Sequence, residues 1–118
     1  MNKFVIKTFK KFILICLLCL LSSNAFSSEF EIQAEKVNYK NTEGKIIAEG
    51  NASAFNQDGK KIFANKIIYL KNIGIIQTYG DSKFADNNKV LTADRFSYNI
   101  NSKIINAIGN VIFTDKDN

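Results

Sequence analysis

The sequence predicts an all-β protein, an open, solenoid-like roll of stacked antiparallel strands with about six strands in three repeats, preceded by a helical signal peptide. Three observations predict this fold: a threefold repeat in the chain after residue 28, apolar alternation within each repeat, and turn residues between the strands. A length of 118 residues allows one small domain. We therefore expect a signal peptide at residues 1–27 and one β domain at residues 28–118.

The N-terminus has the three parts of a secretory signal peptide. Met1–Lys11 carries four lysines, Phe12–Leu21 is an apolar run of ten residues, and residues 22–28 are rich in small side chains. Small residues permit cleavage after Ala25 or after Ser27, and the sequence leaves both open. As a helix, the apolar run is too short for a hydrocarbon core of about 30 Å, so a retained membrane anchor is the less favoured alternative.

The composition after the signal argues against several classes of protein. The formal net charge is +5, but four of the 16 basic residues lie in the first eleven positions, and the rest of the chain has twelve basic and eleven acidic residues. This nearly neutral body does not predict nucleic-acid binding. Both cysteines, Cys16 and Cys19, lie in the apolar run and the chain has no histidine, so we expect no disulfide, metal site or cofactor. Without a nucleophile and base pair, we expect no enzymatic activity.

The chain after the signal repeats three times in one register. An alanine, a tyrosine, a glycine and the polar residue after it recur at separations of 30 and 29 positions. These columns are Ala34, Ala64 and Ala93; Tyr39, Tyr69 and Tyr98; Gly50, Gly80 and Gly109; and Asn51, Asp81 and Asn110. Such a pattern is typical of repeat proteins, in which each unit packs against its neighbours.

The first half of each repeat predicts a strand with a bend. These halves are residues 30–39, 61–69 and 90–98, and the apolar alternation shifts by one residue after the alanine in each of them. A strand cannot skip a residue without turning its side chains to the other face, so we expect a bulge or sharp bend there. Bends at one point in every layer would fold the sheet into a trough.

The second half of each repeat predicts a strand that keeps its alternation. These strands begin at Ile46, Ile76 and Ile105. A glycine within a strand marks a bend, which predicts a second line of bends at Gly50, Gly80 and Gly109. Turn residues separate the strands at 41–44, 56–59, 72–74, 86–88 and 99–101.

The inner face of the trough predicts an apolar groove, although recurring apolar positions can equally form an ordinary core. Its floor is thin in the first two repeats, whereas a closed core in a domain this small would need bulky side chains. An apolar groove can hold acyl chains, because burial of each CH₂ stabilises by about 0.8 kcal/mol. We expect the groove to be lined by Ile32, Ala34, Ile46, Ala48, Ala52, Ile62, Ala64, Ile76, Thr78, Phe84, Leu91, Ala93, Ile105, Ala107, Val111 and Phe113.

The repeated pattern A-x-x-[VIF]-x-Y, a turn, and I-x-[AT]-x-G-[ND] resembles the OstA-like family of periplasmic lipopolysaccharide-transport proteins. It occurs at Ala34–Tyr39 with Ile46–Asn51, at Ala64–Tyr69 with Ile76–Asp81, and at Ala93–Tyr98 with Ile105–Asn110. The resemblance covers nearly all of residues 30–117. It implies that residues 28–118 form an open, twisted β-jellyroll that carries lipopolysaccharide, with the lipid A acyl chains in the groove and the sugar outside.

The same resemblance implies a location and partners. Family members act in the periplasm, bridging the inner and outer membranes, and stack on other OstA-like proteins through unpaired edge strands. We therefore expect docking edges near Phe30–Ala34 and Asn110–Thr114, with a head-to-tail homo-oligomer as one arrangement. A bridge protein of the LptA type, an LptC-type protein and the N-terminal periplasmic part of an LptD-type translocon all fit. An exported structural or adhesive β-solenoid without lipid cargo is an alternative of another class.

Overall fold

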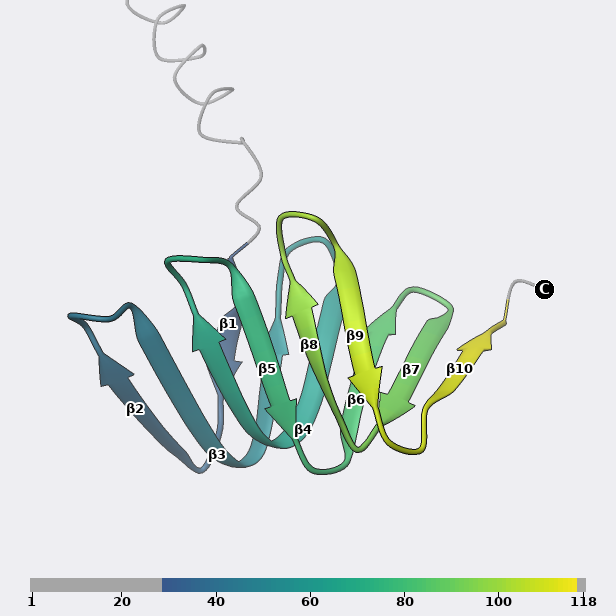
Figure 1. Ribbon diagram of the computed structural model, residues 1–118, viewed down its shortest axis with the longest axis horizontal. Helices are drawn as coiled ribbons and strands as arrows, with labels where there is room; N and C mark the ends of the chain where they lie inside the picture. The colour runs from purple at the N-terminus through teal and green to yellow at the C-terminus, as the bar shows by residue number, and fades with distance from the viewer. Residues whose placement is uncertain (1–28, 117–118) are drawn as a thin grey trace, which may run out of the picture.

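The computed structural model describes residues 29–116, which form a single antiparallel β-sheet (Figure 1). The predicted all-β roll of antiparallel strands is confirmed. The predicted signal peptide lies outside the described residues. Within residues 29–116 there is no helix long and apolar enough to cross a membrane.

The sheet contains ten strands, which arise from six passes of the chain. β3 (Lys45–Phe55) and β4 (Lys60–Leu70) are continuous strands of 11 residues each. Each of the other four passes is interrupted near its middle and yields two short strands. These are β1 (Glu31–Gln33) and β2 (Lys36–Lys40), β5 (Ile75–Tyr79) and β6 (Ser82–Asp86), β7 (Lys89–Ala93) and β8 (Arg95–Asn99), and β9 (Ile104–Ile108) and β10 (Ile112–Asp115). The prediction of about six strands counted passes, and the bends divide four of them.

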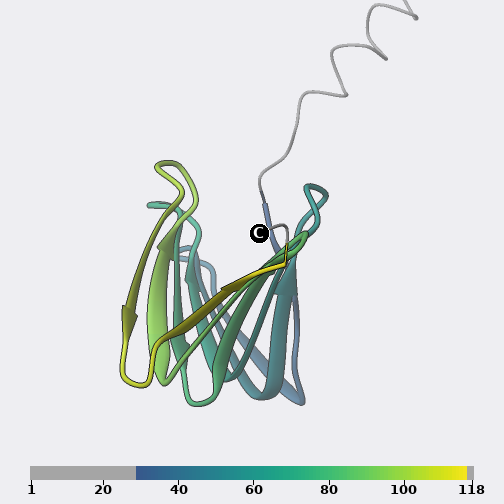
Figure 2. The same cartoon turned by 90° about the vertical axis from the view of Figure 1, so that its right-hand side faces the viewer.

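The sheet folds along its bends into a trough with two walls (Figure 2). One wall consists of β2, the first half of β3, the second half of β4, β5, β8 and β9. The opposite wall consists of β1, the second half of β3, the first half of β4, β6, β7 and β10. Each pass runs along one wall, turns at the bend and continues in the other. Successive passes stack along the trough, and the two passes of each repeat form one layer.

The glycine column forms one line of bends. The glycines have φ between 78° and 84°, and the polar residue after each has φ between 45° and 49°. Two consecutive residues with left-handed backbone reverse the direction of the strand, and glycine adopts this conformation without a steric penalty. The residues concerned are Gly50 with Asn51, Gly80 with Asp81, and Gly109 with Asn110. These positive φ angles occur at the three glycines where the sequence predicts bends.

The second line of bends follows the alanine column and is hydrogen-bonded to the first. The backbone N–H groups of Glu35, Asn65 and Asp94 donate to the carbonyl oxygens of the three column glycines at 3.0, 2.9 and 2.7 Å. Side chains reinforce two of these contacts, since the amides of Asn51 and Asn110 donate to the carboxylates of Glu35 and Asp94. The two lines of bends therefore lie side by side along the floor of the trough.

The bends are expected to tolerate no side chain at the glycine column. In Gly80→Ala, the new methyl group would collide with the Asn65 side chain and would also oppose the positive φ of 78°. We expect a loss of about 2 kcal/mol or more in the free energy of unfolding, measured by urea denaturation. Gly59→Ala is the matched control, because its φ is 85° but no atom lies within 4 Å of the added methyl. An equal loss in both variants would contradict the collision.

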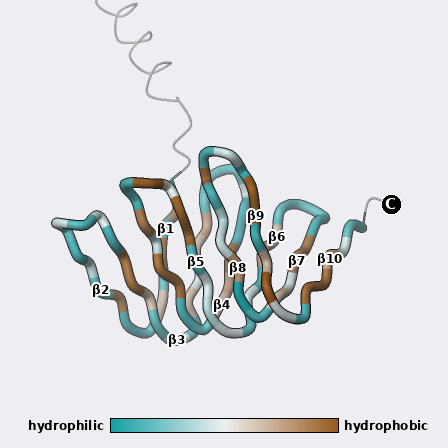
Figure 3. The backbone as a smooth tube through the Cα atoms, viewed as in Figure 1, coloured by the Kyte–Doolittle hydropathy of each residue, from teal (hydrophilic) through white to brown (hydrophobic). Residues whose placement is uncertain are grey.

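The core fills the trough between the walls in the first two layers. Hydrophobic and hydrophilic residues alternate along the strands (Figure 3), and the inward series includes Ile62, Ile67 and Ile76, none of which is exposed. Ala48, Ala52 and Ala54 are at most 1% exposed. The expectation that small residues leave an open floor in the first two repeats is therefore wrong. Small side chains allow the walls to approach, and isoleucines fill the remaining space.

Aromatic side chains continue the core towards the third layer. The rings of Phe30 and Tyr98 meet edge to face with centroids 6.1 Å apart, and Phe84 contacts both Tyr98, at 5.1 Å, and Phe96, at 6.2 Å. Phe30 precedes β1, so the start of the described chain packs against a residue two repeats later. This contact ties the two ends of the roll to one core.

Thr78 and Ser82 form a buried polar bridge at the middle bend. The Thr78 hydroxyl donates to Ser82 Oγ at 2.6 Å and accepts from the Phe96 N–H at 2.9 Å, while the Ser82 hydroxyl donates to the Asp94 carbonyl at 3.2 Å. Backbone pairing between these passes stops at Gln77 and resumes at Ser82, and the hydroxyl groups bridge the gap. Thr78 was expected to line the groove, but its hydrogen bonds hold it in the core at 1% exposure.

The Thr78 hydroxyl is expected to contribute measurably to stability. Thr78→Val keeps the shape of the side chain but leaves the buried Phe96 N–H without its acceptor. We expect the free energy of unfolding to fall by about 1–3 kcal/mol in urea denaturation. Thr92→Val, at a half-buried position of β7, is the control and should change stability by less than about 0.5 kcal/mol. Wild-type stability of Thr78→Val would show that the bridge is dispensable.

Candidate apolar binding site

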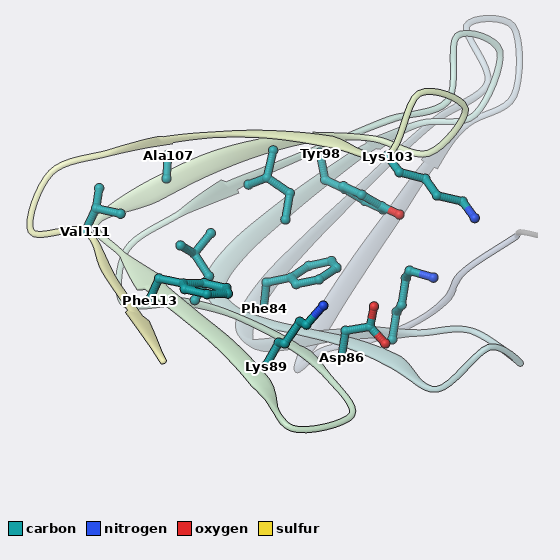
Figure 4. A pocket seen from close by; sticks show the side chains of 11 residues that line it. Phe84, Asp86, Lys89, Tyr98, Lys103, Ala107, Val111 and Phe113 are labelled. Carbon is teal, nitrogen blue, oxygen red and sulfur yellow. The ribbon is translucent and has the colours of Figure 1, made fainter. Parts of the chain in front are cut away.

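An apolar cavity of about 660 Å³ opens between the walls at the C-terminal end of the trough (Figure 4). Most of its lining is hydrophobic, with four charged groups among the lining residues. The hydrophobic side chains are Phe84, Leu91, Tyr98, Ile105, Ala107, Val111 and Phe113, and the charged ones are Lys60, Asp86, Lys89 and Lys103.

The cavity lies where the stack of layers ends. β9 pairs with β8 in one wall and β10 pairs with β7 in the other, and the described chain adds no further layer beyond them. Val111 and Phe113 consequently remain 50% and 62% exposed, although their inward positions match the buried Ala52 and Ala54 of the first repeat. Phe84 and Tyr98 are buried behind them. The cavity is therefore an unfilled end of the core.

The structure brings six of the sixteen predicted groove residues to this cavity: Phe84, Leu91, Ile105, Ala107, Val111 and Phe113. Ile32 and Ala34 are partly buried and pack against the core. The remaining eight are buried between the walls: Ile46, Ala48, Ala52, Ile62, Ala64, Ile76, Thr78 and Ala93. Side-chain parity predicts which face of the sheet a residue lies on, but it does not determine how far apart the two walls lie.

Five lining residues were not anticipated. Tyr98 belongs to the tyrosine column, which the sequence analysis treated as structural only. Lys60 and Lys89 share a column with Phe30, at separations of 30 and 29 positions, so the repeat register contained a signal for them. Asp86 also lies in a column of polar turn residues, with Asn56 and Asp115, whereas Lys103 stands in the column of Gly44 and Gly74, so only the fold brings Lys103 to the cavity.

Two tyrosines beside the core have raised pKa values. Burial raises the pKa of Tyr98 above its usual value of 10.0, and the charges of Asp86 and Asp58 raise it further. Burial also raises the pKa of Tyr69, where a hydrogen bond with the Phe30 backbone acts in the opposite direction. Both phenols therefore stay neutral at physiological pH, and Tyr98 presents a neutral surface to the cavity.

The lining combines an apolar interior with charged groups, a combination that suits an amphiphile. Apolar side chains converge on its interior, and charged groups are available for a polar head. Within residues 29–116 no three His, Cys, Asp or Glu side chains lie close enough together to hold a metal ion.

No protein-family model matches this chain, and no curated protein matches it in sequence. Among solved structures, the fold is similar to that of LptH, the LptA-homologous periplasmic component of the lipopolysaccharide transport device of Pseudomonas aeruginosa. The two chains are 9% identical, with a TM-score of 0.41 over 75% of this chain and 95% of the LptH chain. A likeness at this level does not establish a family or a function, and the assignment of the fold rests on the strand pairing itself.

Proposed function

We propose that this protein binds lipopolysaccharide by its lipid A acyl chains and carries it through the periplasm towards the outer membrane, as a component of a protein bridge. The observation that carries the proposal is the apolar cavity at the open end of the trough. An acyl chain placed there would gain about 0.8 kcal/mol for each buried CH₂. A short stretch of chain is therefore enough for binding without a catalytic group or a unique polar anchor.

The cavity and the sequence pattern both support this proposal. The pattern that resembles the OstA-like family shapes the bends and the core, and it includes three of the lining residues, Tyr98, Ile105 and Ala107. The cavity is lined mainly by residues outside this pattern, such as Leu91 and Val111. The pattern thus supports the kind of protein, and the cavity supports the kind of ligand.

The packed first two layers favour a second candidate, an exported structural β-solenoid without lipid cargo. A filled interior stabilises such a solenoid and requires no ligand. In that case the open third layer would be covered by another protein. The two candidates differ in what contacts the cavity lining in the cell.

Site-specific photocrosslinking separates these candidates. A photoreactive residue at Leu91 or Ile105, both lining the cavity, is expected to capture lipopolysaccharide in cells. The same residue at Thr92 or Asn106, one position further along each strand, points to the other face of the sheet and should capture none. Equal labelling from both faces, or capture of protein alone at Leu91 and Ile105, would contradict the lipid-carrier proposal.

The edges of the roll suit end-to-end stacking. β1 and β10 are the outer strands of one wall, and β2 and β9 those of the other, so a second copy could continue both walls at once. The predicted docking segment Phe30–Ala34 contains β1, and Asn110–Thr114 covers all of β10 except Asp115. The C-terminal edge also exposes large apolar side chains, namely Ile104, Ile108 and Ile112 at 56–62%. We propose that β10 of one copy, or of a related protein, pairs with β1 of the next.

Two single-cysteine variants test this arrangement. With Cys16 and Cys19 changed to alanine, Glu31→Cys places a thiol on β1 and Thr114→Cys places one on β10, at positions that would face each other if the repeat register continued across the contact. A mixture of the two proteins under mild oxidation is expected to form a disulfide-linked dimer, because the contact joins unlike edges. Each variant alone is the control. Equal dimer in either single sample would indicate a like-to-like contact and contradict head-to-tail stacking.

A further inference from the structure

We propose that the mouth of the cavity binds the phosphomonoester head group of an amphiphile through Lys60, Lys89 and Lys103. This inference rests on the proposed function, since the chains of the same amphiphile would occupy the cavity. It adds the chemical class of the head group and the residues that recognise it.

The three lysines approach the cavity from both walls. Lys60 begins β4 and Lys89 begins β7, both in the wall that contains β10, whereas Lys103 lies in the turn that precedes β9. Figure 4 shows Lys89 and Lys103 on opposite sides of the opening, with Asp86 beside Lys89. An amphiphile with its chains against Leu91 and the other apolar side chains would have its head group between these ammonium groups.

The charge at the mouth matches a phosphomonoester. Three lysines and Asp86 give the lining a formal charge of +2. None of the three lysines takes part in the salt bridge found within residues 29–116, which joins Lys66 to Glu49 elsewhere in the sheet. A phosphomonoester carries about −1.5 to −2 at pH 7, whereas a carboxylate carries at most −1. The charge of the lining therefore favours a phosphomonoester over a carboxylate as the head group.

Lys103 occupies a strained backbone position. Its φ is 61°, in the left-handed region, and the corresponding turns of the first two repeats have Gly44 and Gly74 with φ of 60° and 68°. In those turns a Cβ would collide with Asn72 or Asn101 of the next turn, whereas the third turn has no described neighbour beyond it. Space thus permits a side chain in the third turn, but the unfavourable φ remains. A strained residue at a ligand site points to a role for its side chain.

Lysines also occur at one repeat column only in the repeats where that column lines the cavity. Phe30, Lys60 and Lys89 share one column, and Phe30 is buried in the core at 6% exposure. Lysine replaces the aromatic residue only in the second and third repeats, where the column reaches the cavity. Lysines that served only to make the surface soluble would not be restricted to the repeats that line the cavity.

Binding of two amphiphiles with the same chain tests the site. Calorimetry with the wild-type protein, below the critical micelle concentrations, should give about tenfold tighter binding of dodecyl phosphate than of dodecyl maltoside, which is uncharged. The double variant Lys89→Met with Lys103→Met keeps the apolar stems and should lose this preference while still binding dodecyl maltoside. Lys61→Met with Lys83→Met, two exposed lysines outside the cavity, removes the same charge and should keep it.

The variant Lys103→Gly distinguishes two explanations for this lysine: that its side chain binds the head group, or that the turn only has space for it. Relief of the unfavourable φ should raise Tm by about 4 °C, while the affinity for dodecyl phosphate should fall about threefold to fivefold. A higher Tm with unchanged affinity would overturn the assignment of Lys103.

Three further outcomes would overturn the proposal, and they are distinguishable. Equal affinity of the wild-type protein for both amphiphiles would remove the head-group site and leave the lipid cavity intact. Binding of neither amphiphile would remove the cavity function and this inference together. Inorganic phosphate that binds as tightly as dodecyl phosphate would show a site for the free anion rather than for a lipid head group.

Discussion

The hydrogen bond that crosses the floor of the trough in each layer determines the shape of this protein. A glycine carbonyl accepts from the backbone N–H of the residue after the alanine column, and this hydrogen bond joins the two bends of the layer. Glycine is required at this position for two reasons. Its φ is positive, and a neighbouring side chain occupies the space that a Cβ would need. A flat sheet of this size would expose one apolar face to water. Folding at the paired bends brings both halves of that face together, so the core depends on the bends.

The cavity follows from the same stacking rule. Each layer is covered by the next, and small residues in the first two repeats let the walls close on isoleucine and aromatic side chains. The third layer has no described successor, so inward residues such as Val111 and Phe113 remain exposed. An apolar site thus arises at the end of the stack without any residue that is unusual for a core. The same feature makes the end a natural place for a further layer, from another copy or another protein, and links ligand binding to assembly.

The charged groups of the mouth show how a repeat can differ in one layer without a change of fold. Lys60 and Lys89 occupy a column in which the first repeat has the buried Phe30. Lys103 replaces a turn glycine and retains its left-handed backbone. These changes lie at strand ends and in a turn, where the core and the bends are unaffected. A head-group site could therefore be added to a structural repeat at small cost in stability.

The sequence by itself determined the roll, its bends and the face on which each side chain lies. Periodicity and glycine spacing express local backbone geometry, and the slip after Ala34, Ala64 and Ala93 could be counted directly. The distance between the walls, by contrast, depends on how side chains from both walls pack against each other. These side chains come from segments that are far apart in the sequence. The small residues of the first two repeats therefore indicated an open floor, although they are buried between the walls. The location of the cavity, and the approach of Lys103 to Lys89 across it, were decided by the tertiary structure, because only the stacking of the layers shows which one is left uncovered.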